Sequence, residues 1–185
     1  MPVRNTPAEY GLMTKALHWV IVVVMALQFL VGYTMTRIDD DEYEGMLGLS
    51  EDRLFVIHTS LGVTVLALAL IRLIWRASTR LPDWASTLTH FERRFAHLVE
   101  RGLYLLMFAV PLSGILAALA DDKNLVVFGI FKVPNLLPDI DDLDDLAIAF
   151  HIFSHLAFFA VASLHVGLIV KHQVVNRDRL LNRML

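Results

Sequence analysis

Four long apolar runs, separated by polar segments, dominate the sequence. We place them at about residues 16–35, 54–75, 102–120 and 147–170. A helix of about 20 mostly apolar residues crosses the hydrocarbon core of a bilayer, and each run has about this length. The pattern therefore predicts an all-α integral membrane protein: a four-helix bundle in up-down-up-down order, forming a single membrane domain over residues 1–185.

The composition supports a membrane protein. Hydrophobic residues make up 56% of the chain, and the mean hydropathy is +0.58, which is more apolar sequence than a soluble domain of this size needs. Cysteine is absent. This excludes disulfides, thiolate metal sites, iron–sulfur clusters and covalent attachment of c-type haem.

The first run has a second interpretation, as the apolar region of a cleaved signal peptide, because a short segment with Arg4 and Lys15 precedes it. Such a region is usually shorter, and it ends in a cleavage site of the A-x-A type, which does not follow this run. We therefore expect the run to be kept as a membrane helix. His18 and Trp19, near its start, fit an interfacial position.

Charge differs between alternate polar segments. The N-terminal segment, residues 76–101 and the C-terminal tail together hold 11 Lys/Arg and 5 acidic residues, whereas residues 36–53 and 121–145 hold 4 and 14. Because Lys and Arg accumulate in cytoplasmic loops, both termini are expected in the cytoplasm and the two acidic loops outside. The pattern thus predicts four membrane crossings with both ends on the cytoplasmic side.

Three local features refine these helices. Residues 89–102 have helical periodicity and are expected to lie partly in the membrane interface before the third run. Pro111 is expected to kink that run, with neighbouring helices bonding the freed carbonyl. The acidic residues of 139–145 are expected to cap the fourth helix and to complement its dipole.

The last apolar stretch carries histidines at 151, 155, 165 and 172, and ligating side chains within a span are candidates for function by default. His151 and His165 are 14 residues apart, which on a helix gives a rise of about 21 Å and nearly four whole turns. The two imidazoles are therefore expected to face the same side of one helix, one near each membrane surface.

Other helices supply a partner at each depth. His18 lies near the cytoplasmic end of the first run, at the level of His165, and His58 lies near the external end of the second run, at the level of His151. Each pair can supply the two axial imidazoles of one haem b. The pattern predicts two haem b groups with these four histidines as the axial ligands of the iron, and it singles out no catalytic side chain.

Small and basic residues recur at the same interval. Gly32 follows His18 by 14 residues, at the depth of the outer pair, where a missing side chain leaves room for a macrocycle. Arg72 follows His58 by 14 residues, at the depth of the inner pair, where a guanidinium suits a haem propionate. Gly62, one turn from His58, is expected to relieve crowding in the same way.

The remaining histidines have other assignments. His155, one turn after His151, is an alternative ligand, although its depth fits less well. His172 is expected near the membrane surface, where it snorkels or contacts a propionate. His90 and His97 are expected to line the polar side of their segment, with a contact to the inner haem or to a quinone head group as the alternative for His97.

Taken together, the motifs resemble those of the bacterial cytochrome b561 family, and they extend over nearly the whole chain. The motifs are His-Trp at 18–19, His58 with Gly62 and Arg72, the stretch AHLVERGLYLLMFAVPLSG at 96–114, and the pair His151 and His165. The resemblance implies a four-helix membrane bundle with two b haems, and it carries over the two histidine pairs as axial ligands.

The best-known relatives in that family are superoxide oxidases, which pass electrons from superoxide outside the membrane to ubiquinone within it. The resemblance therefore implies a superoxide oxidase-like enzyme with ubiquinone as acceptor and superoxide or another periplasmic donor. Broader relatives are the cytochrome b subunits of hydrogenases and formate dehydrogenases, so a haem b membrane anchor of a quinone-reducing dehydrogenase is the alternative. Membrane lipid is a further expected partner, and a nucleic-acid partner is not expected.

The charge of the outer loops bears on this choice. Superoxide is an anion, and electrostatic steering favours a basic approach surface, but the cations of these loops are outnumbered; they are Arg37, Arg53, Lys123 and Lys132. Lys123 and Lys132 lie in the more apolar half of the second loop and can form a local basic site. A cationic protein partner is the other interpretation. A transporter or metal carrier would instead bind metal without a haem absorption band.

Overall fold

The computed structural model describes residues 2–36, 48–123, 125–138, 140 and 142–185. The acidic run after the first helix, with Arg37, lies outside the described residues, as do Asp139 and Asp141 of the second acidic loop.

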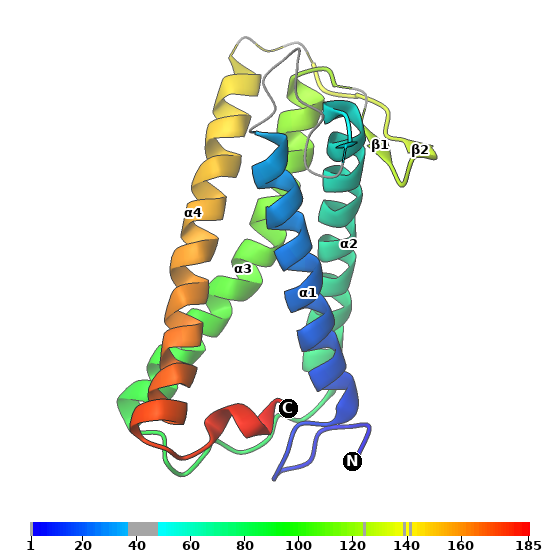
Figure 1. The fold of residues 1–185 in the computed structure, drawn as a ribbon. Coiled ribbons are helices and arrows are strands. Elements are labelled where there is room, and N and C mark those ends of the chain that lie inside the picture. The colour runs from blue at the N-terminus through cyan, green and yellow to red at the C-terminus, as the bar shows by residue number, and fades with distance from the viewer. Residues whose placement is uncertain (1, 37–47, 124, 139, 141) are drawn as a thin grey trace.

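Four long helices form the molecule (Figure 1). They are α1 (Leu12–Met35), α2 (Glu51–Ser78), α3 (His90–Ala120) and α4 (Leu143–Val170). The shorter elements are two strands, β1 (Val126–Val127) and β2 (Phe131–Lys132), a π-helical turn that continues α4 (Lys171–Val175), and a 3₁₀ turn (Leu180–Arg183).

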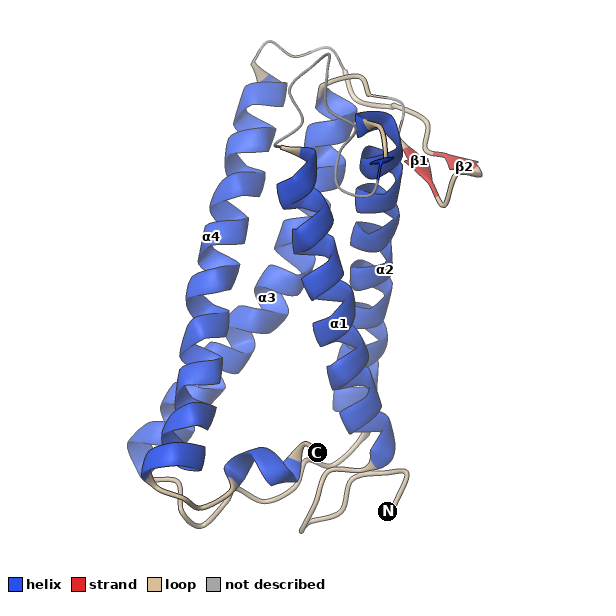
Figure 2. Cartoon of the chain, viewed as in Figure 1, coloured by secondary structure: helices blue, strands red, loops and turns tan. Residues whose placement is uncertain are grey.

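All four helices are long and apolar enough to cross a membrane, and each apolar run of the sequence lies within one of them. The predicted all-α membrane bundle is confirmed, with one small hairpin added to it, as Figure 2 shows. Large apolar side chains face outward along the helices, for example Ile74 (59% exposed) and Phe153 (66% exposed). This is the distribution expected where lipid is the solvent.

The helices pack in two pairs, α1 on α2 and α3 on α4, and α2 joins the pairs through α3. Apolar side chains from three helices meet at the centre: Ile21, Met25, Val65, Ala69 and Met107. Both termini lie at one end of the bundle (Figure 1). We call this the basic end, and we call the opposite end, where α2 and α4 begin, the acidic end.

Helix α3 is continuous from His90 to Ala120, so residues 90–101 are part of the same helix as the third apolar run. A capping box fixes its start: Thr89 Oγ1 accepts from the Glu92 N–H at 3.3 Å, and the Thr89 N–H donates to Glu92 Oε2 at 2.9 Å. The reciprocal bonds satisfy two backbone donors and let the helix begin well before the apolar run. Pro111 lies inside this helix, as expected.

The start of α4 differs from the expectation. Asp142 is the N-terminal capping residue, but its side chain makes no capping hydrogen bond, and its φ of 59° is left-handed. That backbone conformation turns the chain into the helix without the usual side-chain acceptor. Asp144 and Asp145 lie in the first turn, where their charges complement the helix dipole as predicted.

Candidate functional site

Two histidines from α1 and α4 meet near the basic end. The ring centroids of His18 and His165 are 6.3 Å apart, and the ring planes are inclined by 60°. The sequence pattern paired these two residues by depth, and the fold brings them together across the bundle.

Two further histidines, from α2 and α4, meet near the acidic end. The ring centroids of His58 and His151 are also 6.3 Å apart, with the planes nearly perpendicular at 89°. Helix α4 therefore contributes one imidazole to each pair, and its 14-residue interval sets the separation of the two levels.

The centroid separation matches the geometry of two imidazoles on one metal ion. An imidazole nitrogen lies about 1.1 Å from the ring centroid, and a metal–imidazole nitrogen bond is about 2 Å long. Two axial imidazoles on one iron therefore place their centroids about 6.2 Å apart. The centroid separation of both pairs is close to this value.

His151 is held in one tautomer by groups on α3. Its Nδ1 lies 3.0 Å from the Val110 carbonyl oxygen and 2.9 Å from Ser113 Oγ, and the Ser113 hydroxyl donates to the same carbonyl at 2.8 Å. A carbonyl oxygen only accepts, so Nδ1 carries the proton and Nε2 keeps its lone pair. Metal-bound histidines characteristically have this arrangement, because the second hydrogen bond orients the ring.

Glycines make room for the imidazoles of the acidic-end pair. A Cβ added at Gly32 would lie 2.8 Å from His58 Cε1, and one added at Gly114 would lie 2.7 Å from His151 Cε1. Gly32 was predicted at this depth, and its missing side chain leaves room for the His58 imidazole. A Cβ at Gly62 would only touch the Gln28 amide, at 3.5 Å.

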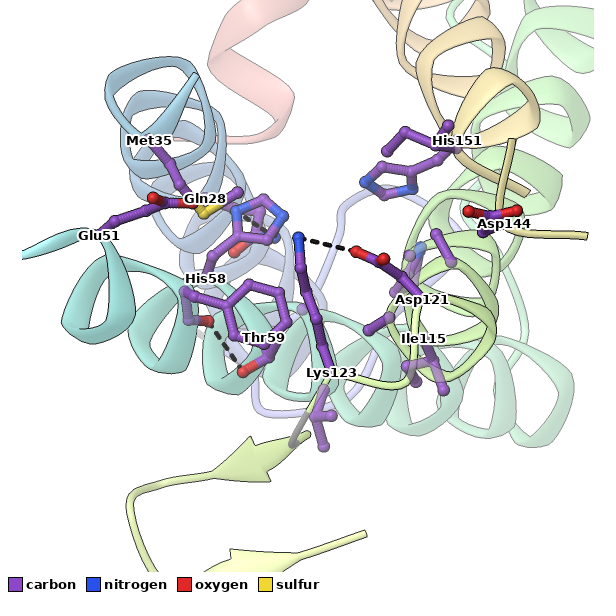
Figure 3. Close-up of a pocket in the computed structure, with 18 of the residues that line it drawn as sticks. Gln28, Met35, Glu51, His58, Thr59, Ile115, Asp121, Lys123, Asp144 and His151 are labelled. Carbon is purple, nitrogen blue, oxygen red and sulfur yellow. Dashed lines mark hydrogen bonds and ion pairs between the residues drawn. The ribbon is translucent and has the colours of Figure 1, made fainter. Parts of the chain in front are cut away.

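A cavity of about 360 Å³ opens between His58 and His151 (Figure 3). Carboxylates surround its mouth: Glu51, Asp121, Asp144 and Asp145. Lys123 is the one Lys or Arg among the described residues that line the cavity, and its Nζ lies 2.9 Å from Asp121 Oδ2. Lys132 is not among those lining residues, so the local basic site predicted from both lysines reduces to Lys123.

Arg72 lies beside the basic-end pair, as its position in the sequence predicted. Its Nη1 is 3.1 Å from His18 Nδ1, and its Nε donates to the Tyr104 hydroxyl at 3.2 Å. The guanidinium carbon also lies 5.8 Å from the centre of the Tyr104 ring. A fixed cation at this position can pair with an anionic group bound next to His18 and His165.

His155 lies next to the acidic-end pair. Its ring centroid is 4.2 Å from that of His151 and 5.4 Å from that of Phe29, whose ring is inclined to it by 76°. Its Nε2 is buried and has no hydrogen-bond partner among the described residues. A buried nitrogen without a hydrogen-bond partner is expected where a ligand or cofactor binds and supplies that partner.

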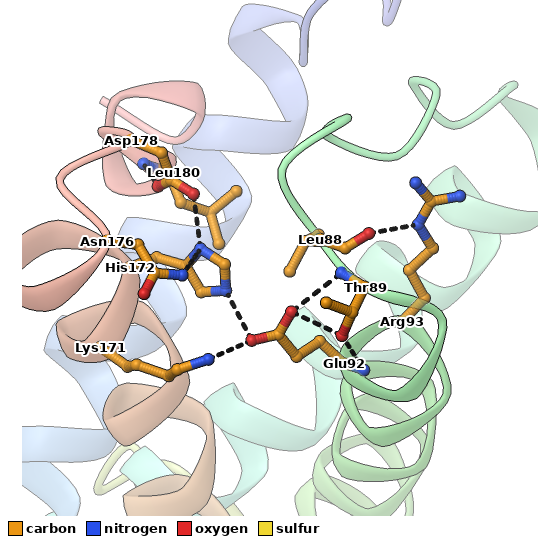
Figure 4. Close-up of polar contacts among 9 residues, drawn as sticks. All are labelled: Leu88, Thr89, Glu92, Arg93, Lys171, His172, Asn176, Asp178 and Leu180. Carbon is orange, nitrogen blue, oxygen red and sulfur yellow. Dashed lines mark hydrogen bonds and ion pairs between the residues drawn. The ribbon is translucent and has the colours of Figure 1, made fainter.

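His172 does not snorkel toward the membrane surface, because its side chain is 0% exposed. Figure 4 shows it between two carboxylates: Nδ1 lies 2.6 Å from Asp178 Oδ2, and Nε2 lies 3.4 Å from Glu92 Oε1. Glu92 also pairs with Lys171. The tail folds back after the π-helical turn and buries the imidazole, which an extended helix would have left at the surface.

The same contacts affect Asp178. Desolvation raises the pKa of its carboxyl group, but hydrogen bonds from His172 and Thr87 outweigh this effect and hold the pKa below its usual value. The carboxylate is therefore charged at neutral pH and holds the tail against His172 and against Thr87, just before α3.

His90 and His97 lie near the start of α3, and both are exposed, as the interpretation of a polar helix side predicted. The ring centroids of His97 and Trp84 are 4.9 Å apart, and the two rings are nearly perpendicular. His97 Nδ1 is 4.0 Å from Glu100 Oε2.

Three residues beside the histidines were given no role from the sequence: Gln28, and Ser113 and Gly114 at the end of the quoted stretch 96–114. Each carried a weak signal. Gln28 interrupts the apolar run VVVMALQFLVG, and the other two follow Pro111 directly in PLSG. A polar side chain or a glycine inside a span often marks a contact, but only the helix packing shows which histidine it serves.

Comparison with known proteins agrees with this arrangement. The sequence profile of the prokaryotic cytochrome b561 family matches residues 9–185. The chain belongs to this family. Cytochrome b561 homolog 2 of Escherichia coli is 32% identical over 189 residues, which cover 100% of this chain and 95% of the relative. Probable superoxide oxidase CybB of Yersinia pestis is 22% identical over 178 residues, 96% of each chain. The resemblance inferred from the motifs is confirmed.

Family membership sets the class of cofactor and of reaction. Cytochrome b561 proteins bind haem b, so this chain is a membrane haem b electron-transfer protein. The residues present fit such a group, because two pairs of imidazoles have the separation of axial ligands. The glycines at Gly32 and Gly114 keep one of these pairs free of a steric conflict.

We expect Gly114→Ala to lower the haem b content of the purified protein, by up to half, because the added methyl overlaps the His151 ring of one pair. Gly32→Ala should act in the same way through His58. Gly167→Ala is the matched control, because a Cβ there meets nothing within 4 Å. Pyridine haemochrome assays measure the content, and equal haem in Gly114→Ala and Gly167→Ala would contradict the steric argument.

Proposed function

We propose that this protein is a superoxide oxidase-like enzyme that passes electrons from superoxide, at the periplasmic side of the bacterial inner membrane, to ubiquinone in the bilayer. It holds two haem b groups. The observation that carries the proposal is the occurrence of two histidine pairs with the same 6.3 Å centroid separation, one toward each end of a membrane bundle.

The proposed axial ligands are His18 with His165 and His58 with His151. Haem b, when bound, supplies one-electron chemistry, and the protein supplies ligation, burial and charge. Arg72, beside the first pair, would bind a haem propionate. A guanidinium carries five N–H donors, so Arg72 has donors for a propionate oxygen besides the one that contacts His18 Nδ1.

The reaction balances with protons from water. Two superoxide anions lose one electron each and leave as two molecules of oxygen, while ubiquinone gains two electrons and two protons to form ubiquinol. The electrons have to cross the membrane, and the two imidazole pairs lie at two depths within it. The 14-residue interval on α4 separates these depths by about 21 Å along the helix.

The proposed orientation places both termini in the cytoplasm. Lys and Arg are concentrated in the segments at the basic end, and carboxylates are in excess in the loops of the acidic end. Because Lys and Arg accumulate in cytoplasmic loops, this distribution supports a cytoplasmic basic end. The cavity at His58 and His151 then opens toward the periplasm, where it would receive the donor.

A second candidate function is that of a haem b membrane anchor in a quinone-reducing dehydrogenase or hydrogenase. The observation that favours it is the acidic mouth of the cavity, where four carboxylates are opposed by Lys123 alone among the described lining residues. Such a mouth repels an anion and attracts a basic protein surface. The name of the Yersinia pestis relative favours the first candidate, for that protein is described as a probable superoxide oxidase.

The ligand pairing predicts which variants share a defect. His58→Ala and His151→Ala should each lose one haem, and the same one, because each removes one of its two axial bonds. His18→Ala and His165→Ala should lose the other haem. Reduced-minus-oxidised spectra of the purified variants check this. Loss of the same haem from His18→Ala and His58→Ala would rule out the pairing.

The donor is tested by stopped-flow mixing of the oxidised holoprotein with superoxide. We expect rapid reduction of the bound haem, followed by reoxidation when ubiquinone is added, with about two haems per chain. A control with superoxide dismutase removes the donor and should abolish the reduction. Haem that ignores superoxide would overturn this function, and co-purification of a peripheral redox subunit would then support the anchor.

A further inference from the structure

The β-hairpin projects beside α2 at the acidic end (Figure 1). Its strands are antiparallel, with Val127 opposite Phe131, and the Ile130 N–H donates to the Val127 carbonyl at 3.2 Å. Phe128 and Gly129 have φ values of 55° and 70°. Two consecutive left-handed residues make a tight turn whose twist suits a hairpin, so the tip has a defined shape.

Hydrogen bonds attach this hairpin to α2. The Phe128 N–H donates to Ser60 Oγ at 2.7 Å, and Thr59 Oγ1 lies 3.2 Å from the Val126 carbonyl oxygen, to which it donates. Leu125 is 1% exposed and Val127 is 5% exposed, so one side of the hairpin is packed against the protein.

The side of α2 that receives the hairpin is its lipid side. Ser60 precedes Ile71 by 11 residues and Ile74 by 14, which are close to whole numbers of turns, so the three residues share one face of α2. Ile71 and Ile74 are 51% and 59% exposed on an otherwise apolar helix. The hairpin therefore covers this face of α2 near the acidic end. Nearer the basic end, the same face is exposed and would contact lipid.

The attachment point lies below the end of the helix. Ser60 is nine residues after Glu51, a rise of about 14 Å. Helix α2 has 28 residues and is about 42 Å long, which exceeds the hydrocarbon core of about 30 Å by about 6 Å at each end if it is centred. The Phe128 backbone, which is bonded to Ser60, therefore lies about 8 Å inside the edge of the hydrocarbon core.

The outward side of the hairpin is apolar. Phe128, Ile130 and Phe131 are 56%, 76% and 64% exposed, and Lys132 follows them at the exposed end of β2. The backbone around them is bonded by the turn, by Ser60 and by a 2.9 Å bond from the Val133 N–H to the Leu125 carbonyl. These bonds satisfy part of the hairpin backbone, and a segment with such bonds and apolar side chains is compatible with the interfacial part of a bilayer.

We propose that the hairpin is a lipid-binding element whose tip, Phe128, Ile130 and Phe131, enters the outer part of the acyl-chain region, beneath the head groups. Lys132 lies where it can reach a lipid phosphate. The hairpin would then fix the depth and tilt of α2, the helix that carries His58. This proposal does not depend on the electron donor.

The absence of cysteine allows nitroxide labelling at single introduced cysteines in the holoprotein, reconstituted in phospholipid nanodiscs. Ile130→Cys and Phe131→Cys place the label on the hairpin. Leu70→Cys, on the exposed apolar side of α2, is the lipid control, and Asp52→Cys, exposed in the first turn of α2, is the aqueous control. Power-saturation EPR compares collisions with oxygen, which partitions into lipid, and with a water-soluble nickel chelate.

We expect the labels at Ile130 and Phe131 to resemble the label at Leu70, with high oxygen and low nickel accessibility. Nickel accessibility equal to that at Asp52 at both hairpin positions would overturn the proposal, and the apolar tip would then face water as a docking site for another protein. Two independent positions keep the result decisive if one variant fails to retain haem.

A second observation concerns Gln28, which is 6% exposed within α1. Its Nε2 lies 3.2 Å from both ring nitrogens of His58, while its Oε1 is buried with no hydrogen-bond partner. A neutral imidazole has one N–H and one lone pair, so an amide nitrogen can satisfy only one of these two contacts. A half-turn of the amide brings Oε1 to the ring N–H and breaks no bond of the oxygen.

We infer that Gln28 is the positioning residue of His58: its Oε1 accepts the Nδ1–H and leaves Nε2 for the iron. His151 already has this arrangement through the Val110 carbonyl, and the partner histidine of a metal site needs an equivalent acceptor. This inference rests on the proposed ligand role of His58.

Gln28→Leu removes the acceptor, and Gln28→Glu strengthens it. Because an acceptor at Nδ1 makes the imidazole more electron-donating, we expect the midpoint potential of one haem to rise in Gln28→Leu and to fall in Gln28→Glu. Gln173→Leu is the control, since its Oε1 is also buried without a partner but lies on the π-helical turn at the basic end. Spectroelectrochemical titration of the holoproteins measures both potentials.

The two possible failures are distinguishable. If His58→Ala retains both haems, the proposed ligand set fails. If His58→Ala loses one haem but Gln28→Leu keeps both haems at unchanged potentials, only the role of Gln28 fails. Equal shifts in Gln28→Leu and Gln173→Leu would also overturn it, because the effect would then be unspecific.

Discussion

The structure depends on holding imidazoles in facing pairs inside an apolar bundle. A histidine in a membrane needs a polar partner, because hydrocarbon offers none. Here α1 and α2 lie opposite α4, so that His18 meets His165 and His58 meets His151 at one common separation. That separation suits an iron ion between the rings, and it fixes how closely α1 and α2 can approach α4. Under the proposed ligation, the spacing of the helices sets how well each pair fits its iron.

Residues that weaken a membrane helix occur where they serve these pairs. Glycine and glutamine lower the stability of an apolar helix, yet Gly32, Gly114 and Gln28 all lie against the His58–His151 pair. The glycines avoid overlap with the rings, and the amide offers hydrogen-bonding groups that the bilayer does not. Local departures from good helix sequence are expected at functional sites, where another requirement is met instead.

The two ends of the bundle use charge differently. At the basic end, the carboxylates of Glu92 and Asp178 enclose the buried His172 and tie the C-terminal tail to α3. Arg76 and Glu100 join α2 to α3 through a further pair, with one bond of 2.9 Å. At the acidic end, carboxylates surround an open cavity, and the hairpin covers α2. One end is closed by ion pairs, and the other has an accessible site.

The sequence determined the helices and the depth of each histidine, because 20-residue apolar runs and a 14-residue interval have direct geometric meaning on an α-helix. It also identified Arg72 as a neighbour of the basic-end pair. Only the tertiary structure decided that Asp178 buries His172, that the Val110 carbonyl orients His151, and that a hairpin lies on α2 at Ser60. These contacts join segments that are far apart in the sequence. They depend on how the chain turns back after each helix, and the spacing of residues along one helix carries no information about that.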